Sequence, residues 1–256
     1  MVFIFKWIHI FKQFKIEVIF SVHGKYRVAT EKTLFAMPET AIGFFADVGG
    51  SYFLSRLNNN LGIFLVLTGN RIKGQDNKRV GIATHYVSKD NLASLETKLN
   101  ETSNLNDSKV ENIITNFNES VAGEYPSEKI SEVFSASTVE EMISRLEKEN
   151  TDWSAQQLKL LNKMSPLSLK VAIKQLNNGL KMNLKNCLEM EYVLGQRFLD
   201  DSDFFEGVRA LLVNKGDKPT WKPKTFGEVT SEKVDWFFKD LPSDEKLILN
   251  DLKSNL

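Results

Sequence analysis

Residues 34–57 read LFAMPETAIGFFADVGGSYFLSRL, and this stretch decides how the rest of the sequence is interpreted. It holds two acids, Glu39 after a proline and Asp47 shortly before a pair of glycines. Apart from Thr40, the other residues between Leu34 and Asp47 are apolar or small. Apolar surroundings disfavour the charged form of a carboxyl group and move its pKa toward the range useful for proton transfer. Glu39 and Asp47 are therefore the candidate catalytic residues.

Composition narrows the classes of protein to consider. The 256 residues include 33 Lys plus Arg and 33 Asp plus Glu, so the chain has no net charge. A general nucleic-acid binder normally has a basic excess, so nucleic acid is not an expected partner. The one cysteine, Cys187, cannot form an internal disulfide and is expected to be a buried residue on a helix. His9, His23 and His85 have no metal-like spacing, so no metal is expected.

Working outward from the opening stretch, the pattern predicts strands first. Tyr26, Val28 and Thr30 alternate as in a strand. The glycine pair at 49–50 indicates a turn, and Ser51 is expected to cap the helix that follows. A second apolar helix is predicted over 61–67, ended by Gly69, and then a short polar helix and a strand over 82–87.

From residue 91 onward the pattern is helical. Helices are predicted over 91–104, 107–120, 186–200 and near 231–239. Three further starts carry cap signals: a capping box within 137–141, Ser165 before Pro166, and Asp203 three residues before Glu206. Composition thus divides the chain into an atypical segment over 1–20, a strand-containing part over 21–90 and a helical region over 91–256.

Residues 1–20 are aromatic and basic, and differ from the rest of the chain. Their longest apolar run is too short for a transmembrane span. Lys6, His9, Gln13 and Glu17 recur at helical spacing, which would allow an amphipathic helix at a membrane surface. Alternatives are a presequence, a segment foreign to the domain, or a segment that covers an open sheet edge.

The stretch from His23 to Leu57 resembles the crotonase (enoyl-CoA hydratase/isomerase) superfamily. The motif residues are Pro38 and Glu39, then Gly43, then the pair at 49–50, in that order. The piece LTGNRIKGQDNKRVGIATHYV is also similar to the helix–turn–strand of that superfamily. The resemblance implies an α/β fold of the ClpP/crotonase type, with an incomplete ββα core over 21–90 followed by the helical region.

Within the superfamily, the chain is most similar to the 3-hydroxyisobutyryl-CoA hydrolases. The residues that carry this likeness are FAMPETAIGFFADVGGSYFLSRL, FSASTVEEMISRL, NKMSPLSLK and FFEGVRALLVNKGDKPTWKP. The likeness implies hydrolysis of the thioester of 3-hydroxyisobutyryl-CoA, in valine breakdown and in mitochondria. It also implies that coenzyme A is part of the substrate and that no separate cofactor is needed.

The resemblance assigns a role to each acid. Glu39 would attack the thioester carbonyl or activate water against it, and Asp47 would position the substrate or assist proton transfer. From the residues alone, two other roles stay open: Glu39 as a strand-end partner of Lys32, and Asp47 as a turn-stabilising residue. Ala46 stands where the superfamily typically has proline.

The superfamily holds the thioester oxygen between two backbone N–H groups, one of them from a Gly-rich turn. The matching place here, residues 14–20, reads FKIEVIF and has no glycine. Because losing one such donor costs about a hundred- to a thousandfold in rate, the chain is expected to have weak activity or none. An enoyl-CoA hydratase or isomerase, or an inactive binding module, therefore remain alternatives.

Assembly into a homo-oligomer is expected by analogy. The C-terminal residues 254–256, SNL, are a faint peroxisomal alternative to the mitochondrial address.

Overall fold

The chain folds into two compact units, each built from two separated stretches of sequence. A computed structural model describes residues 8–10 and 22–250 of the chain. Within these, unit 1 comprises residues 8–10, 22–36 and 71–126, and unit 2 comprises residues 37–70 and 127–250. The division predicted at residues 20 and 90 follows the change in composition along the sequence, whereas these units are defined by contacts in space. Each unit is described by itself.

Unit 1 contains two small sheets. Strand β2 (Tyr26–Ala29) lies between β1 (Ile8–Ile10) and β5 (His85–Tyr86), and all three are parallel. Val28 is opposite Ile10 on one side and His85 on the other. Strands β3 (Leu34–Ala36) and β4 (Arg71–Lys73) form an antiparallel pair, with Phe35 opposite Ile72.

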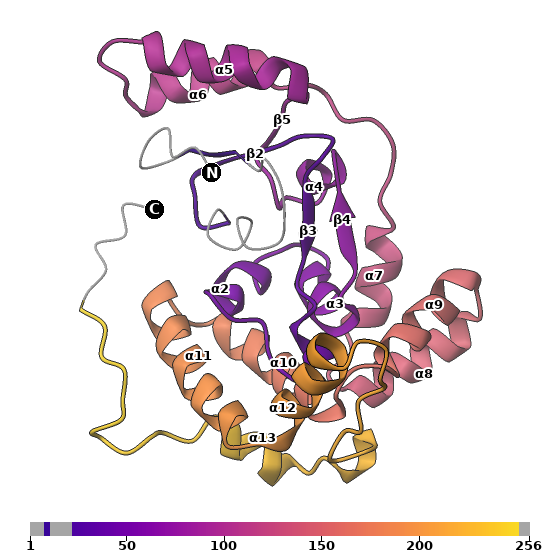
Figure 1. Cartoon of the computed structure of the whole chain (residues 1–256). Helices are drawn as coiled ribbons and strands as arrows, with labels where there is room; N and C mark the ends of the chain where they lie inside the picture. The colour runs from indigo at the N-terminus through magenta and orange to yellow at the C-terminus, as the bar shows by residue number, and fades with distance from the viewer. Residues whose placement is uncertain (1–7, 11–21, 251–256) are drawn as a thin grey trace. The chain divides into compact units, whose positions relative to one another are not determined.

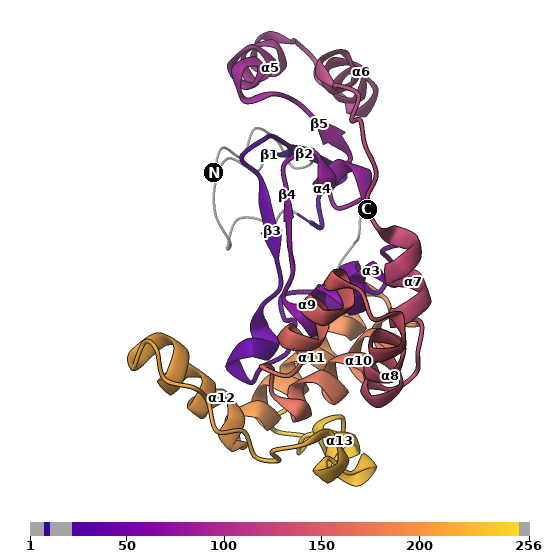
Figure 2. The same ribbon diagram turned by 90° about the vertical axis from the view of Figure 1, so that its right-hand side faces the viewer.

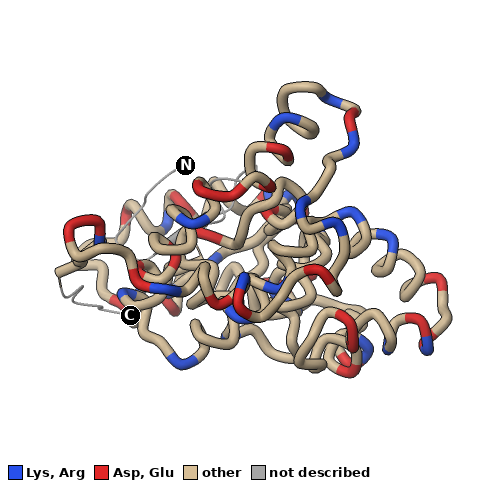
Figure 3. Tube along the Cα trace, turned by 90° about the horizontal axis from the view of Figure 1, so that it is seen from below, with Lys and Arg blue, Asp and Glu red and all other residues tan. Residues whose placement is uncertain are grey.

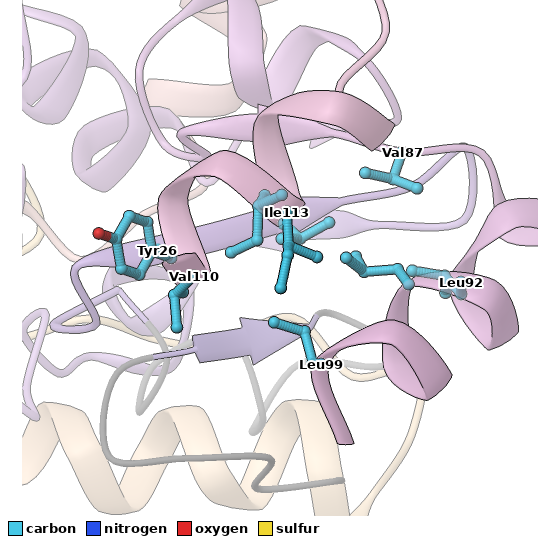
Figure 4. Close-up of a cluster of buried hydrophobic side chains, with 9 residues drawn as sticks. Tyr26, Val87, Leu92, Leu99, Val110 and Ile113 are labelled. Carbon is cyan, nitrogen blue, oxygen red and sulfur yellow. The ribbon is translucent and has the colours of Figure 1, made fainter. Parts of the chain in front are cut away.

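Three helices complete unit 1: α4 (Asp76–Arg79), α5 (Lys89–Glu101) and α6 (Asp107–Phe117). Helices α5 and α6 lie side by side in both ribbon views (Figures 1 and 2). Each buries one face, because apolar residues recur three or four positions apart. These side chains pack with apolar residues of β2 and of the segment after β5 (Figure 4), in a cluster made of Tyr26, Val28, Val87, Leu92, Leu95, Leu99, Val110, Ile113 and Ile114.

The regular elements of unit 2, among its described residues, are all helices. Its first stretch supplies a short 3₁₀ helix and two α-helices: η1 (Glu39–Ile42), α2 (Gly50–Leu54) and α3 (Leu61–Thr68). Its second stretch supplies the remaining elements, which are α7 (Ser127–Phe134), α8 (Val139–Glu149), α9 (Asp152–Leu161), α10 (Pro166–Gly179), α11 (Leu184–Leu199), α12 (Ser202–Val208), η2 (Arg209–Val213), η3 (Phe226–Glu228) and α13 (Ser231–Phe237).

Helix α10 is the central element of unit 2. Ser165 caps it by accepting a hydrogen bond from the N–H of Ser168, and Pro166 occupies its first turn, as the sequence predicts. Apolar residues are buried on several of its faces, and it contacts η1, α2, α3 and α13. Leu167 and Val171 join a core that also holds Phe45, Leu194, Phe198, Val229, Val234 and Phe237. Both turns that carry the candidate acids therefore contact one buried helix.

Most predicted elements are confirmed, within the usual few residues at their ends. The strands of the described chain all precede Val87, and the regular elements after it are all helices. The strand predicted over 82–87 is shorter, because Ala83 donates its N–H to the carbonyl of Asn77 in the α4 turn. Strand β4 was not predicted, since three residues are too few for a visible period.

Residues 8–10 form a strand, so an amphipathic helix is wrong at these positions. By pairing with β2, β1 covers an edge of that strand, one of the alternatives left open by the sequence. The rest of 1–20 lies outside the described residues. None of the described helices combines the length and apolar character needed to cross a bilayer.

Candidate active site

Glu39 begins a single turn of 3₁₀ helix. Pro38 precedes η1 and Gly43 ends it with a left-handed backbone, φ 69°. Strand β3 ends at Ala36, so Glu39 is not a strand-end residue. Its side chain is half-buried, and its Oε2 atom is fully buried. The turn therefore presents a carboxyl group in a largely dry setting, which suits a nucleophile or a base.

The Glu39 turn is fixed by hydrogen bonds to two helices. Thr40 donates its hydroxyl to the carbonyl of Val66 in α3, at 2.8 Å, and accepts the N–H of Ser165 at 3.2 Å. The hydroxyl of Ser165 donates in turn to Oδ2 of Asp203, at 2.6 Å. The other oxygen of Asp203 accepts the N–H of Lys222, at 2.8 Å. A buried polar chain thus joins the turn to α10 and α12.

Aromatic packing anchors the segment between the two acids. The ring of Phe45 stacks on Phe198 of α11 with centroids 5.5 Å apart, and Phe44 meets Phe204 of α12 at 4.7 Å. Gly43 and Gly207 allow η1 to approach α12 closely, because a Cβ on either would overlap backbone of the opposite element. The double phenylalanine therefore sets the position of the chain between Glu39 and Asp47.

Asp47 lies in a strained turn before α2. Its carbonyl accepts the N–H of Gly50 at 2.9 Å, and burial raises the pKa of its side chain. The next two residues both have left-handed backbones, with φ 56° at Val48 and 79° at Gly49. A β-branched residue rarely adopts this conformation, which costs on the order of 1–3 kcal/mol and concentrates at functional sites.

Two buried polar side chains hold the Asp47 turn from either side. From α10, Nε2 of Gln175 donates to the carbonyl of Ala46 at 2.6 Å and to the hydroxyl of Ser51 at 2.8 Å. From α11, Glu191 accepts the N–H of Gly49 at 2.7 Å and the N–H of Ser51 at 2.9 Å. The Ser51 hydroxyl also donates to Glu191, at 2.5 Å.

Two predicted caps are wrong. Ser51 does not cap α2; Gly49 precedes the helix, and the free N–H groups are bonded by Glu191 instead. Asp203 does not begin α12 either: Asp201 caps that helix by accepting the N–H of Asp203. Asp203 is inside the helix and fully buried. At α2 a side chain distant in sequence replaces the local cap, whereas at α12 the cap lies two residues earlier than predicted.

Sequence reasoning missed Glu191 and Gln175, although a signal for Glu191 exists. Glu191 follows Cys187 by four residues and precedes Leu194 by three, so it occupies the buried face of α11. A carboxylate on that face needs polar partners, because an unpaired buried charge is costly. Gln175 follows Val171 by four residues and gives the same, weaker signal.

Glu191 is expected to make stability depend on pH. Burial, with a smaller contribution from the charge of Asp47, raises the pKa of Glu191 to about 7, against the hydrogen bonds from Ser51 and Gly49. A group whose pKa is higher in the folded than in the unfolded state stabilises the fold at a pH below its unfolded-state pKa. This stabilisation is lost as pH rises through its folded-state pKa. We expect the free energy of unfolding of wild type, relative to Glu191→Gln, to fall by about 2–3 kcal/mol between pH 5 and 8. Urea unfolding across this range measures it, and a pH-independent difference would contradict it.

Cys187 is buried, as the sequence predicts, and burial raises the pKa of its thiol to about 11. Thiolates rather than thiols react with disulfide reagents, so native protein should react very slowly. In the time that unfolded protein takes to react with one equivalent of reagent, we expect native protein to react with less than about a tenth of an equivalent. The ratio follows the smaller fraction of thiolate in the native state. Titration with a chromogenic disulfide, with and without denaturant, measures this, and rapid native labelling would show that Cys187 is accessible.

The sequence profile described as Enoyl-CoA hydratase/isomerase matches residues 18–238, which include both acids and every side chain that holds their turns. The chain belongs to the enoyl-CoA hydratase/isomerase family. Among the described residues, no group of three or more His, Cys, Asp or Glu side chains is arranged to hold a metal ion.

Curated relatives of the chain carry a more specific name than the family. The chain is 47% identical over 233 residues to the mitochondrial 3-hydroxyisobutyryl-CoA hydrolase of Homo sapiens, covering 88% of the chain and 60% of that relative. It is 45% identical over 234 residues to the enzyme of the same name from Dictyostelium discoideum, covering 89% and 61%. The chain thus spans about three fifths of the length of these relatives.

Solved structures of the same family share the fold. A carnitinyl-CoA dehydratase from Mycobacterium thermoresistibile matches with a TM-score of 0.79 at 30% identity, over 89% of this chain and 65% of that one. An enoyl-CoA hydratase from Rhodobacter sphaeroides 2.4.1 matches with a TM-score of 0.76 at 27% identity, over 94% and 68%. The α/β crotonase-like fold predicted from the motif is therefore confirmed, whereas residues 14–20, the place of the Gly-free segment, lie outside the described residues.

Proposed function

We propose that this chain carries the catalytic acids of a 3-hydroxyisobutyryl-CoA hydrolase. The observation that carries the proposal is the identity of 44–47% to hydrolases of that name over about 88% of the chain, together with an anchored Glu39 turn in the same stretch. Water adds its hydroxyl to the acyl carbon and its proton to the CoA thiolate, giving 3-hydroxyisobutyrate and free CoA. Coenzyme A belongs to the substrate, and the reaction needs no separate cofactor.

Glu39 would act at the thioester carbonyl. As a nucleophile, its carboxylate forms an acyl anhydride and expels the CoA thiolate, and water then cleaves the anhydride. As a general base, it takes the proton of the attacking water in a single addition. Asp47, whose pKa is raised by burial, would hold the hydroxyl end of the substrate or pass a proton to the departing sulfur.

A competing function is supported by the solved relatives, which are a dehydratase and a hydratase of acyl-CoA compounds. Hydration adds water across a carbon–carbon double bond and leaves the thioester intact. The two reactions are separated by their products: free thiol for hydrolysis, and loss of enoyl absorbance without free thiol for hydration. The buried Cys187 makes thiol detection clean in native protein.

The test supplies 3-hydroxyisobutyryl-CoA and a short enoyl-CoA to the purified chain in parallel. Release of CoA from the first, with no loss of enoyl absorbance in the second, supports the hydrolase. The reverse result supports the hydratase. Saturable binding of CoA with neither reaction supports a binding module, and absence of both turnover and binding overturns the proposal for this chain.

Location and assembly are also proposed from relatives. The curated relatives are named mitochondrial, and we place this chain there too, rather than in peroxisomes. Assembly into a homo-oligomer is proposed by analogy with the superfamily. Fractionation of cells probed for the chain, and light scattering of the purified protein, test these two statements.

A further inference from the structure

The Asp47 turn is held at both of its ends by side chains that come from far along the chain. Ala46, just before Asp47, has its carbonyl bonded by Gln175, and Gly49, two residues after Asp47, has its N–H bonded by Glu191. Gln175 and Glu191 lie on different helices, α10 and α11. The hydroxyl of Ser51 joins them, accepting from Gln175 and donating to Glu191.

Both side chains are buried, so this arrangement costs free energy to build. Glu191 is 5% exposed and Gln175 is 0% exposed. A carboxylate removed from water is tolerated only when hydrogen bonds replace its hydration, and Glu191 accepts three. A short polar side chain at the start of α2 would satisfy the same N–H groups at lower cost. Glu191 and Gln175 therefore do more than cap the start of α2.

These hydrogen bonds flank a strained segment of the backbone. Val48, in its left-handed conformation, lies between the two held residues, Ala46 and Gly49. A strained conformation persists only where its surroundings over-determine it. With backbone atoms on both sides held by buried donors and acceptors, Asp47 has little freedom to move.

We propose that Glu191 and Gln175 are positioning residues that fix Asp47 for its role in the proposed thioester reaction. They act on the substrate only through Asp47, and the inference rests on the proposed function for its kinetic part. Glu191 also places a second acid close to Asp47, which adds to the dry, acidic character of this turn.

The first test does not depend on turnover. Amide hydrogen exchange by NMR is compared between wild type and Glu191→Gln, whose amide keeps the size of the carboxyl but accepts with one oxygen only. We expect the amides of Gly49 and Ser51 to exchange about tenfold faster or more in the variant, while Leu65 in α3 is unchanged. The carboxyl carbon of Asp47 should also titrate at a shifted pH.

The second test reads the reaction. Glu191→Gln and Gln175→Ala are each expected to lower kcat for thioester hydrolysis by about 10- to 100-fold, with KM changed much less, because a misplaced group costs mainly in the transition state. Glu191→Asp is expected to recover part of the loss, since it restores a second accepting oxygen. Glu189→Gln, the same substitution two residues earlier on α11, is the matched control and should behave as wild type.

Each outcome decides one statement. If the amides of Gly49 and Ser51 exchange at the same rate in Glu191→Gln as in wild type, Glu191 does not stabilise the turn and the inference is overturned. Faster exchange with an unchanged Asp47 titration and unchanged kcat overturns the positioning role. A wild type that hydrolyses no thioester overturns the proposed function, and exchange and the Asp47 titration still decide the inference. If Glu191→Gln does not fold, Ser51→Ala removes only the joining hydroxyl and is read in the same way.

Discussion

Glu39→Gln is expected to lower kcat for hydrolysis of 3-hydroxyisobutyryl-CoA by about a thousandfold or more, with KM nearly unchanged. The amide has the size of the carboxyl group but is neither a base nor a nucleophile, so binding persists while the chemistry stops. The buried Oε2 atom and the hydrogen-bonded turn keep the substituted side chain in place. CoA release under saturating substrate measures the effect.

The control for Glu39→Gln is the same substitution at Glu189, whose carboxylate accepts the N–H of Leu249. Its thermal unfolding and turnover should match those of wild type. Residual activity of Glu39→Gln above about a tenth of wild type would show that Glu39 neither attacks nor activates water. Single-turnover hydrolysis in ¹⁸O-labelled water tests the nucleophilic role: Glu39 acquires the label only if it forms the anhydride and water opens that anhydride at the Glu39 carbonyl carbon, whereas a general base never acquires it.

Gly43→Ala is expected to produce the largest loss of stability. An added Cβ would overlap the backbone carbonyl of Asp203, and Ala also disfavours the positive φ of this position. Overpacking against rigid backbone and the forced conformation together should cost about 3 kcal/mol or more. Denaturant unfolding measures the change, and turnover should fall as well, because the same backbone ends the Glu39 turn.

Gly195→Ala supplies the control for this prediction. Gly195 lies within α11 and has no other atoms near the place of a Cβ. Alanine is the better helix former, so this variant should be more stable by about 0.5–1 kcal/mol. If Gly43→Ala were no less stable than wild type, the close approach of η1 to α12 would be wrong.

The sequence predicted the family, which is confirmed, and the catalytic role of the two acids, which stays a prediction; it did not predict which side chains hold them. The residues of the motif from Pro38 to Gly50 are close together in the sequence, and such a local pattern can be recognised in a single sequence. Apart from Val66, the residues that hold this motif follow it by more than a hundred residues: they are Ser165, Gln175, Glu191 and Asp203. Ser165 was predicted as a cap because its signal is local. Gln175 and Glu191 were missed because only the fold brings their helices to the turn.

The wrong caps have the same origin. Ser51 and Asp203 are good cap residues by type, yet each is buried and bonds a side chain from another element. A local rule fails where a distant partner offers a better bond. The charge distribution agrees with the composition: Lys and Arg are interspersed with Asp and Glu along the described chain (Figure 3), in keeping with the absence of net charge.

Because unit 2 is built from two separated stretches of sequence, its parts are synthesised at different times. Glu39 and Asp47 leave the ribosome early, but the carboxylate that bonds Gly49 lies 142 residues later. Until α11 and α12 have been made, Gly49 lacks the acceptor Glu191, and the double phenylalanine lacks Phe198 and Phe204, so part of its apolar surface is open to other proteins. A nascent chain ending before residue 184 should therefore bind chaperones strongly, and one that also includes α11 and α12 should be released.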